Sequence, residues 1–409
     1  NRPGSRALRA AMVANGMEGS PSCMRICLVY DCLFPYTVGG AERWYRNLGE
    51  RLAAGGHDVT YLTLRQWERG ERGEVAGVQV VAVGPRMGLY TRSGRRRILP
   101  PLVFGLGVLR HLLRRGGRYD VVHTAAFPYF SLLAAAAVRP LHGYRLLVDW
   151  LEVWSREYWI EYLGAIGGRI GDAVQALCMR IPQRAFCFSR LNARRLVAGG
   201  YRGRPTVLEG PYAGSLNPRE PGPADALVTF AGRHIPEKRV PAVVPAMASV
   251  RSVLPEVRCV IFGDGPERGR VEELVRLLGL EDAISVPGFV DASEVEETLS
   301  RSACLVLPSR REGYGMIVIE AASAGVPSIV AEDRDNAATE LVEEGVNGFI
   351  ARSAAPEDLS AAIIRAIEGG LPLRQSTADW FRRNARRLSL GHALESVLES
   401  YAGDSSARR

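Results

Sequence analysis

Two carboxylates flank a glycine turn in the segment SRREGYGMIVIEAASAGVP, residues 309–327. Glu312 comes directly before Gly-Tyr-Gly315, and Glu320 lies further along, in an apolar, alanine-rich run. Glycines let backbone amides approach a ligand, and the free N–H groups at a helix start attract phosphate. Each carboxylate can accept hydrogen bonds from vicinal hydroxyls. The pattern therefore predicts a site that holds a diphosphate between a sugar and a ribose, which is the composition of a nucleotide-sugar.

Two cations of different geometry occur in the loop FAGRHIPEK, residues 230–238. Arg233 presents a forked guanidinium, and Lys238, the only lysine of the chain, presents a compact ammonium. Together they suit a diphosphate, whose oxygens point in several directions. The alternative is a pair of solvated surface cations. The place of the single lysine in a loop after an expected strand favours the diphosphate.

The segment FGDGPE, residues 262–267, places Gly-x-Gly between an expected strand and an expected helix. The third glycine of a dinucleotide-binding fingerprint is missing because Gly269 comes one residue late. A nicotinamide site is therefore not indicated. A tight turn that lines a cleft and a direct ligand contact are equally good interpretations of this segment.

Aromatic and acidic residues gather in DWLEVWSREYWIEYLG, residues 149–164. Aromatic faces beside carboxylates suit a polyol or a cationic amino-sugar as an acceptor. The candidate acceptor contacts are Asp149, Trp150 and Glu152. The structural alternative is a helix with one packed aromatic stripe, formed by Trp150, Trp154, Tyr158 and Tyr162.

Short β-branched runs alternate with helical patterns along most of the chain. In the first series we expect strands at 25–30, 58–64, 78–83, 119–123, 145–149 and 185–189. In the second series we expect them at 227–231, 257–262, 283–287, 304–307 and 328–331. Helices are expected at 40–54, 239–253, 266–278, 293–300, 316–324 and 356–368. This order predicts an α/β protein with two Rossmann-like, doubly wound parallel-sheet domains facing each other across a cleft.

Shifts in composition indicate the domain boundaries. We expect a disordered tail at 1–23, an N-terminal acceptor-side domain at 24–210 and a linker rich in Pro and Gly at 211–225. A nucleotide-sugar-binding domain should occupy 226–374. The last helical pattern, 375–402, could cross back to pack on the first domain.

The net charge of +8 allows an anionic partner, such as a phosphorylated metabolite or a membrane surface. We expect no nucleic-acid partner, and the sequence does not indicate an oligomeric state. Seven cysteines without a C-x-x-C pair fit a reducing compartment, and no apolar run is long enough to span a membrane. We therefore expect a cytoplasmic protein. The basic segments 92–97 and 110–118 bracket an apolar run, so peripheral contact with the inner face of the membrane stays open beside a plain solvated face.

Residues 225–370 resemble the nucleotide-binding domain of the GT-B retaining glycosyltransferases of family 4. The segment 34–60 is similar to the glycine loop and first helix of that family. The motifs of the second domain are G-R-x-x-x-E-K, G-D-G-P, P-G-F-V, E-G-Y-G-M-x-x-x-E and A-G-V-P, which begin at Gly232, Gly263, Pro287, Glu312 and Ala324. Together these motifs are far more specific than any one of them alone.

The resemblance implies a role for each matched residue. Arg233 and Lys238 would bind the diphosphate, and Glu312 would contact hydroxyls of the donor sugar, so these three are the expected catalytic residues. The backbone of 288–290 would hold the base, the amides of 315–317 the phosphate and sugar, and Glu320 the ribose. The expected donor-binding residues are thus Gly39, Gly40, Gly288, Val290, Gly315, Met316, Ile317 and Glu320. Gly39 and Gly40 would approach the donor phosphate or the acceptor, unless they only form a strand-to-helix turn.

The first half departs from the family pattern at two strand ends. His123 is followed by Thr124, so the second histidine of the family's H-x-H is missing, and His123 is expected to be a core residue. Where many members have a Thr-x-His-Asp-like strand end, this chain has Asp149 and Glu152. These changes concern acceptor contacts and leave donor binding intact.

The segment Asp-Arg-Asp at 333–335 matches the D-x-D pattern by which another glycosyltransferase fold holds a divalent ion. Its arginine and its place beyond the helix of Glu320 argue against a metal site. We expect no metal and no cofactor, since Arg233, Lys238 and the helix start would stabilise the leaving diphosphate.

The sequence thus predicts a metal-independent retaining glycosyltransferase that moves a sugar from a nucleotide-diphosphate sugar to an acceptor hydroxyl. The acceptor could be a saccharide, a lipid-linked saccharide or a small natural product. Two alternatives remain: a nucleotide-sugar epimerase of the same fold, and a non-catalytic nucleotide-sugar-binding protein.

Overall fold

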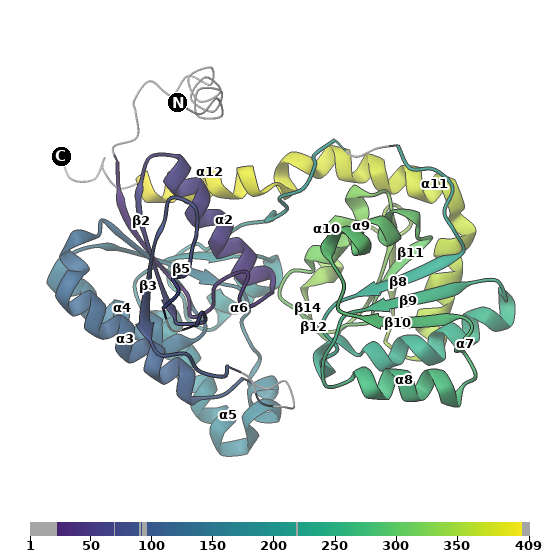
Figure 1. Ribbon diagram of the computed structural model, residues 1–409, viewed down its shortest axis with the longest axis horizontal. Coiled ribbons are helices and arrows are strands. Elements are labelled where there is room, and N and C mark those ends of the chain that lie inside the picture. Colours follow the sequence, from purple (N-terminus) through teal and green to yellow (C-terminus); the bar gives the residue numbers. More distant parts are fainter. Residues whose placement is uncertain (1–22, 69, 90, 92–95, 218–219, 403–409) are drawn as a thin grey trace. The chain divides into compact units, whose positions relative to one another are not determined.

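The computed structural model describes residues 23–402 except 69, 90, 92–95 and 218–219 (Figure 1). Most of the expected tail 1–23 and part of the basic segment 92–97 therefore lie outside the described residues. The chain divides into two compact units. Unit 1 comprises residues 1–89, 97–149 and 174–185, and unit 2 comprises residues 90–96, 150–173 and 186–409, each as far as described. The domain boundaries expected from the sequence stay a prediction.

The first sheet has seven strands in the order β3-β2-β1-β4-β5-β6-β7. Its strands are β1 (Arg25–Val29), β2 (Asp58–Leu64), β3 (Gln79–Gly84), β4 (Val121–Ala125), β5 (Arg145–Trp150), β6 (Arg184–Cys187) and β7 (Thr206–Val207). The accompanying helices are α2 (Gly40–Ala54), α3 (Leu99–Arg115), η1 (Gly116–Arg118), α4 (Tyr129–His142), α5 (Arg156–Arg180) and α6 (Arg190–Ala198).

The second sheet lies wholly in unit 2 and has six parallel strands in the order β10-β9-β8-β11-β13-β15. These are β8 (Leu227–Ala231), β9 (Arg258–Phe262), β10 (Ile284–Gly288), β11 (Cys304–Leu307), β13 (Ser328–Ala331) and β15 (Gly348–Ala351). A small parallel pair is formed by β12 (Arg311–Glu312) and β14 (Asp335–Asn336).

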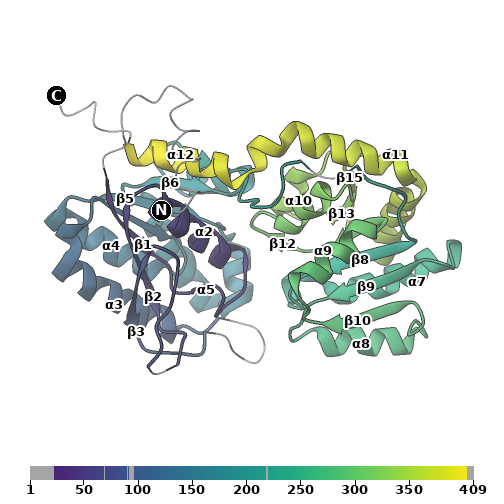
Figure 2. The ribbon, with the colours of Figure 1, turned by 45° about the horizontal axis from the view of Figure 1, so that its top comes forward.

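Helices surround the second sheet, with α7 and α8 beside β9 and β10 (Figure 2). They are η2 (Pro236–Lys238), η3 (Val240–Ala242), α7 (Val243–Val253), α8 (Arg268–Leu277), α9 (Ala292–Arg301), α10 (Met316–Ser323), η4 (Ala337–Leu341), α11 (Pro356–Leu388) and α12 (Leu390–Ala402). Among the described residues, no helix combines the length and the apolar character that crossing a membrane would take.

The central strands are buried along their whole length, as parallel strands covered on both faces must be. All four residues of β11 and all four of β13 are buried. Their sequences, CLVL and SIVA, are nearly uninterrupted apolar runs rather than alternating ones. The two Rossmann-like parallel sheets confirm the predicted α/β class.

Two expected helices have different limits in the structure. The pattern at 239–253 begins as a 3-10 turn, because Arg239 has a left-handed backbone (φ 48°) and α7 starts only at Val243. The pattern at 356–368 continues to Leu388 across a break at Gly370. Glycine and proline at 370 and 372 indicate a stop, but buried apolar residues such as Phe381 continue the packed face beyond it.

Candidate active site

The loops that follow β8, β9 and β10 are tied together by backbone hydrogen bonds. His234 N donates to Asp264 O at 2.9 Å, and Gly263 N donates to Gly288 O at 2.8 Å. The three loops leave neighbouring parallel strands at their carboxyl ends, which is where α/β sheets bind ligands. The predicted diphosphate loop and the predicted base loop are therefore parts of one edge of unit 2.

The glycines of the G-D-G-P turn are required by the close approach of these loops. Gly263 has φ 114°, and a Cβ there would lie 1.9 Å from Gly232 O. Gly265 has φ 151°, and its Cβ would lie 2.5 Å from His234 O. The packing of backbone on backbone accounts for both glycines, which supports the interpretation of this segment as a tight turn.

Lys238 and Glu312 meet in unit 2 although 74 positions separate them. Lys238 Nζ donates a hydrogen bond to Glu312 Oε1, and the Ser309 hydroxyl donates to the same oxygen at 2.7 Å. The side chains of Lys238 and Glu312 are 19% and 10% exposed. The short η2 turn positions the lysine, and the pairing of β12 with β14 positions the glutamate. The structure thus brings together two of the three predicted catalytic side chains.

Arg233, the third predicted catalytic residue, is exposed, and within the described residues its side chain makes no hydrogen bond or ion pair. It follows Gly232 at the end of β8, on the loop that leads to Lys238. The guanidinium is therefore open to an anionic ligand, whereas the Lys238 ammonium is already paired with a carboxylate.

The turn before α10 depends on a left-handed glycine. Gly315 has φ 102°, and a Cβ there would lie 2.6 Å from the Cβ of Ala338. No side chain caps the helix, so the amides of Met316 and Ile317 keep the orientation of first-turn amides without a capping acceptor. Amides in this position can bind an anion, and their contact with a donor phosphate stays a prediction.

Glu320 lies one turn into α10 and is half-buried. Burial and, to a smaller degree, the neighbouring Glu320 carboxylate raise the pKa of Tyr212. Sequence reasoning had placed this phenol in the linker, and it had not connected it with Glu320. Whether Glu320 contacts a ribose stays a prediction.

The base loop contains an exposed aromatic ring that the sequence analysis did not single out. Gly288, the last residue of β10, is buried with φ 89°, and Val290 is half-buried. Between them the Phe289 side chain is 73% exposed. An aromatic face beside a backbone that is expected to hold a base offers a stacking surface.

Gly39 and Gly40 lie in unit 1 at the start of α2. The backbone of Gly39 is extended (φ −170°), and a Cβ there would lie 2.4 Å from Glu42 Oε2. A Cβ at Gly40 would meet nothing within 4 Å. A side chain at Gly39 would require the Glu42 carboxylate to move. The contact of either glycine with a donor stays a prediction.

Two of the three acceptor candidates are fully buried. The carboxylate of Asp149 accepts hydrogen bonds from Trp44 Nε1 at 2.8 Å and pairs with His123 Nε2 at 2.9 Å, and all three side chains lie in unit 1. Trp150 is the last residue of β5 and has no exposed side chain. Asp149 and Trp150 are therefore not open to an acceptor in this conformation, and His123 is a core residue as predicted.

Glu152, the third acceptor candidate, forms an ion pair with Arg311. The Arg311 guanidinium also lies 4.8 Å from the ring of Trp154 and 4.3 Å from the ring of Tyr158. Burial lowers the pKa of Arg311 to about 10. The Tyr158 hydroxyl donates to Glu237 Oε1 at 2.6 Å, next to Lys238 in the chain. This cluster was not predicted, although the adjacent arginines in the opening segment S-R-R-E could have suggested an ion pair.

Both aspartates of the segment 333–335 form ion pairs with arginines. Asp333 pairs with Arg239 at 3.1 Å, and Asp335 pairs with Arg195 at 2.5 Å. Among the described residues, no group of three acidic, histidine or cysteine side chains is arranged to hold a metal ion. The carboxylates of this segment serve ion pairs within unit 2.

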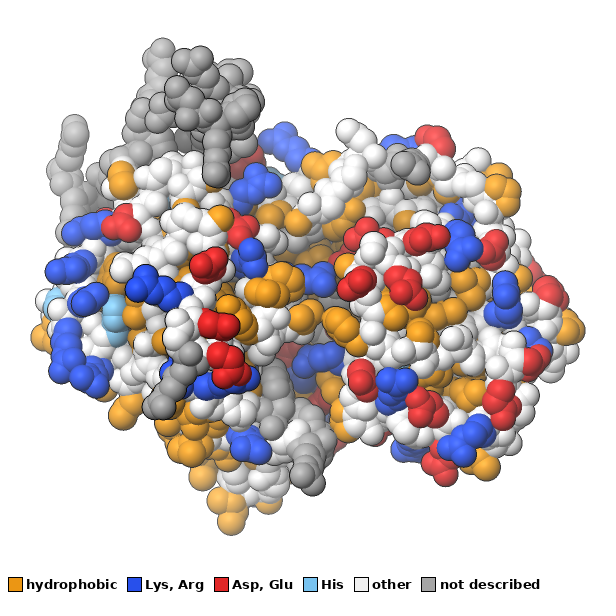
Figure 3. All heavy atoms as spheres, viewed as in Figure 1, with side chains coloured by type: hydrophobic (Ala, Val, Ile, Leu, Met, Phe, Trp, Pro, Cys, Tyr) orange, Lys and Arg blue, Asp and Glu red, His pale blue; other side chains and the backbone are white. Residues whose placement is uncertain are grey.

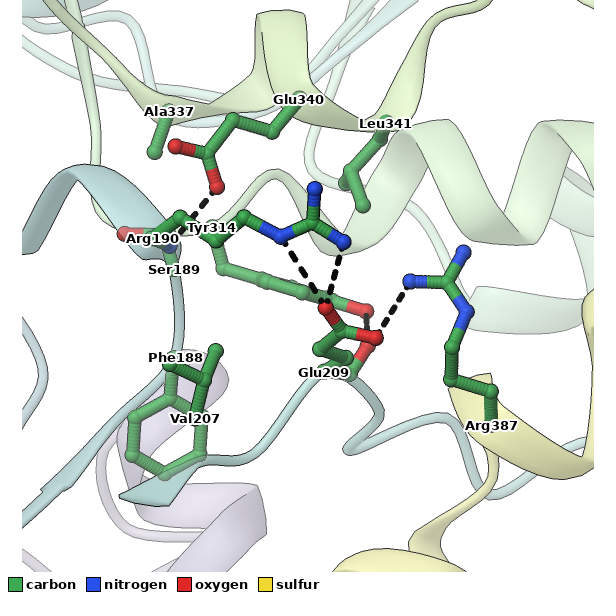
Figure 4. Close-up of a pocket in the computed structure, with 10 residues that line it drawn as sticks. All are labelled: Phe188, Ser189, Arg190, Val207, Glu209, Tyr314, Ala337, Glu340, Leu341 and Arg387. Atoms are coloured by element: carbon green, nitrogen blue, oxygen red, sulfur yellow. Dashed lines mark hydrogen bonds and ion pairs between the residues drawn. The ribbon is translucent and has the colours of Figure 1, made fainter. Parts of the chain in front are cut away.

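A pocket of unit 2 is lined by Tyr314, the middle residue of the Gly-Tyr-Gly turn (Figure 4). The Tyr314 hydroxyl donates to Glu209 O, and the Glu209 carboxylate accepts from Arg190 at 3.0 Å and from Arg387. Burial opposes ionisation of Glu209, but the hydrogen bonds from both arginines prevail and lower its pKa. In the part of the chain that the structure describes, Tyr314 is the only residue of the motifs predicted to bind the donor that lines this pocket.

Both halves of the chain match family models of glycosyltransferases. Residues 218–387 match the family model described as glycosyl transferases group 1, and residues 39–209 match the glycosyl transferase 4-like domain. A glycogen synthase of Mycobacterium tuberculosis is 26% identical over 369 residues, which cover 84% of this chain and 86% of that protein. An α-D-kanosaminyltransferase of Streptomyces kanamyceticus is 30% identical over 142 residues, 35% of this chain and 36% of that protein.

Solved structures share the fold over nearly the whole chain. Sucrose-phosphate synthase from Thermosynechococcus elongatus has a TM-score of 0.76 and 18% identity, covering 94% of this chain and 100% of that one. HepE of Anabaena in complex with UDP has a TM-score of 0.71 and 17% identity, covering 93% and 100%. These similarities confirm the GT-B architecture.

Proposed function

From the premise that the chain belongs to the group 1 glycosyltransferases of the GT-B fold, we propose that it transfers a sugar from a nucleoside-diphosphate sugar to an acceptor hydroxyl. The observation that supports this most directly is the meeting of Lys238 with Glu312 at one edge of unit 2. The cation comes from the loop after β8, and the carboxylate comes from the turn before α10. In this arrangement, the Lys238 ammonium would bind the diphosphate of the sugar donor. The neighbouring Glu312 carboxylate would accept hydrogen bonds from the sugar hydroxyls.

The charges of the site suit a dianionic leaving group. A bound diphosphate would compete with Glu312 for the Lys238 ammonium, while the exposed Arg233 is open to the same anion. The first amides of α10 add neutral donors to these cations. Charge that develops on the departing diphosphate would be stabilised by these groups, so the proposed reaction requires no metal. Glu320 is assigned to the ribose, and the backbone of 288–290 to the base.

The proposed mechanism is front-face transfer with retention at the anomeric carbon. The bond between the anomeric carbon and the diphosphate oxygen breaks, and the acceptor oxygen bonds to the same face of that carbon. The acceptor proton passes to an oxygen of the departing diphosphate, so no protein base is needed. A structure of HepE from Anabaena is in complex with UDP-glucose, which makes UDP-sugars the first donor candidates for this chain.

Thermal-shift binding tests the donor site. UDP, GDP, ADP and their glucose conjugates are added to the wild type with and without magnesium. We expect one nucleotide to raise the unfolding midpoint without a metal requirement, and the shift should be lost in Glu320→Ala. Glu281→Ala, an exposed glutamate before β10, is the matched control and should keep it. If none of the nucleotides shifts the midpoint, the assignment of the donor site is wrong.

Incubation of the binding donor with and without candidate acceptors then tests the reaction. A glycosylated product whose anomeric configuration matches that of the donor supports the proposal. An inverted product contradicts retention. A new sugar nucleotide formed without acceptor would instead identify an epimerase.

A further inference from the structure

Helix α3 exposes a row of leucines to solvent. Leu99 is 61% exposed, Leu102 42%, Leu106 60% and Leu113 48%. Their spacings of three, four and seven positions place them on one face of the helix. An exposed apolar row of this length is unusual on a helix that has only water as its partner.

The opposite face of α3 is the one that packs into unit 1. Phe104, Val108 and Leu112 on that face are fully buried. A surface helix ordinarily has polar residues opposite its buried stripe, whereas α3 is apolar on both sides. The fold of unit 1 accounts for the buried face but leaves the exposed leucines unexplained.

The sequence around the exposed leucine row contains arginines but no acidic residue. Between residues 97 and 118 there is no aspartate or glutamate. The exposed arginines of this segment are Arg97, Arg110, Arg114, Arg115 and Arg118. None of them forms an ion pair with a described residue. Figure 3 shows basic and apolar side chains side by side over the region where Figure 1 places α3.

We propose that α3 docks unit 1 onto an anionic lipid bilayer. The leucine row would enter the boundary between headgroups and acyl chains, and the arginines would contact lipid phosphates. A second copy of this chain is a poorer occupant, because a two-fold interface would place the same arginines against each other. The docking concerns a surface of unit 1 and does not depend on the transferase assignment.

Sedimentation with vesicles tests the proposal. The full chain is mixed, without donor or acceptor, with vesicles of phosphatidylcholine alone or of equal parts phosphatidylcholine and phosphatidylglycerol. We expect binding to the anionic vesicles that weakens as salt is raised, and little binding to the neutral ones. The variant Leu102→Gln/Leu106→Gln should bind the anionic vesicles about tenfold more weakly or worse. Arg114→Ala/Arg115→Ala should lose affinity in the same way.

The chain offers a matched control in Leu277→Gln/Leu278→Gln, a change of two exposed leucines at the end of α8 in unit 2. This variant should bind vesicles like the wild type. All substituted side chains are exposed, so the thermal unfolding midpoints should stay close together. The proposal is overturned if the wild type does not bind anionic vesicles, or if the α3 variants bind as well as the control. It is also overturned if the wild type is a dimer that the leucine changes make monomeric, because the row would then join two copies.

Discussion

The ammonium of Lys238 and the carboxylate of Glu312 neutralise each other in unit 2, and the Ser309 hydroxyl donates to the same carboxylate oxygen. Both partners are largely shielded from water, so the pair is stronger than an exposed ion pair. A donor diphosphate would exchange this contact for one with two or more phosphate oxygens. The pair therefore keeps the site organised before the donor arrives.

Replacing Lys238 by alanine should lower kcat/KM by about 10²- to 10³-fold, equivalent to roughly 3–4 kcal/mol of transition-state stabilisation. The reason is that the leaving diphosphate loses its ammonium, while Glu312 is left unpaired nearby. Steady-state kinetics with the identified donor measure the loss. Arg276→Ala, an exposed cation at the end of α8, should leave the kinetics unchanged. Retained turnover in Lys238→Ala would remove this lysine from the catalytic set.

Replacing Gly263 by alanine should destabilise unit 2 by about 3 kcal/mol, because a left-handed backbone and a clash with Gly232 O are both imposed. Thermal unfolding should show a midpoint several degrees lower. Gly269→Ala is the matched control, since its Cβ would meet nothing within 4 Å and alanine favours the helix α8. Equal midpoints for the two variants would show that the turn can relax away from the loop of His234.

The sequence predicted the sheets well because their strands are short, continuous apolar runs between clear turns. The predicted strands 58–64, 227–231, 304–307 and 328–331 coincide with β2, β8, β11 and β13. Trp150 illustrates the opposite case. One interpretation of the sequence placed Trp150 on the aromatic face of a helix. In the structure Trp150 is the last residue of β5, and α5 begins only at Arg156. Local spacing cannot decide where a strand ends when apolar and acidic residues continue past it.

Side-chain pairing across long separations was beyond the sequence. The family resemblance implied that Lys238 and Glu312 serve one ligand, but it did not show that they bind each other. The contact of Arg311 with Trp154 joins residues 157 positions apart, and no periodicity within either segment indicates it. The hydrogen bond from Trp44 to the buried Asp149 also joins residues that are far apart in the sequence. Such contacts are set by how elements pack, and a single sequence contains only the pattern within each element.

Replacing Arg311 should destabilise unit 2 by about 3 kcal/mol, because Glu152 loses the cation of its ion pair and two aromatic faces lose the same cation. Arg311→Lys should recover little, since an ammonium cannot stack or fork as a guanidinium does. Thermal unfolding of Arg311→Met and of Arg311→Met/Glu152→Gln measures the coupling, and the double variant should be the more stable one. Arg334→Ala, an exposed arginine of unit 2, should change stability by no more than about 0.5 kcal/mol.

Mild acid should weaken unit 2 through His234. Burial lowers the pKa of this imidazole below 6.5, with a smaller opposing effect from its hydrogen bond to Phe262 O. Well above pH 6.5 the histidine is neutral in both the folded and the unfolded chain, so it does not make stability depend on pH there. As the pH falls below 6.5, the unfolded chain takes up the proton first, and stability is lost until the pH passes the lower folded pKa.

The thermal unfolding midpoint of unit 2 should therefore fall between pH 7 and pH 5 by more in the wild type than in His234→Gln. His57 and His111 also have pKa values lowered by burial, but they lie in unit 1. Any pH dependence that they give the whole chain is common to wild type and variant, so the difference between the two is the readout. His392→Gln, at an exposed position, should follow the wild type. Because His234 lies on the loop between Arg233 and Lys238, nucleotide binding should weaken over the same range. Identical slopes for wild type and His234→Gln would mean that the loop accommodates the charged imidazole.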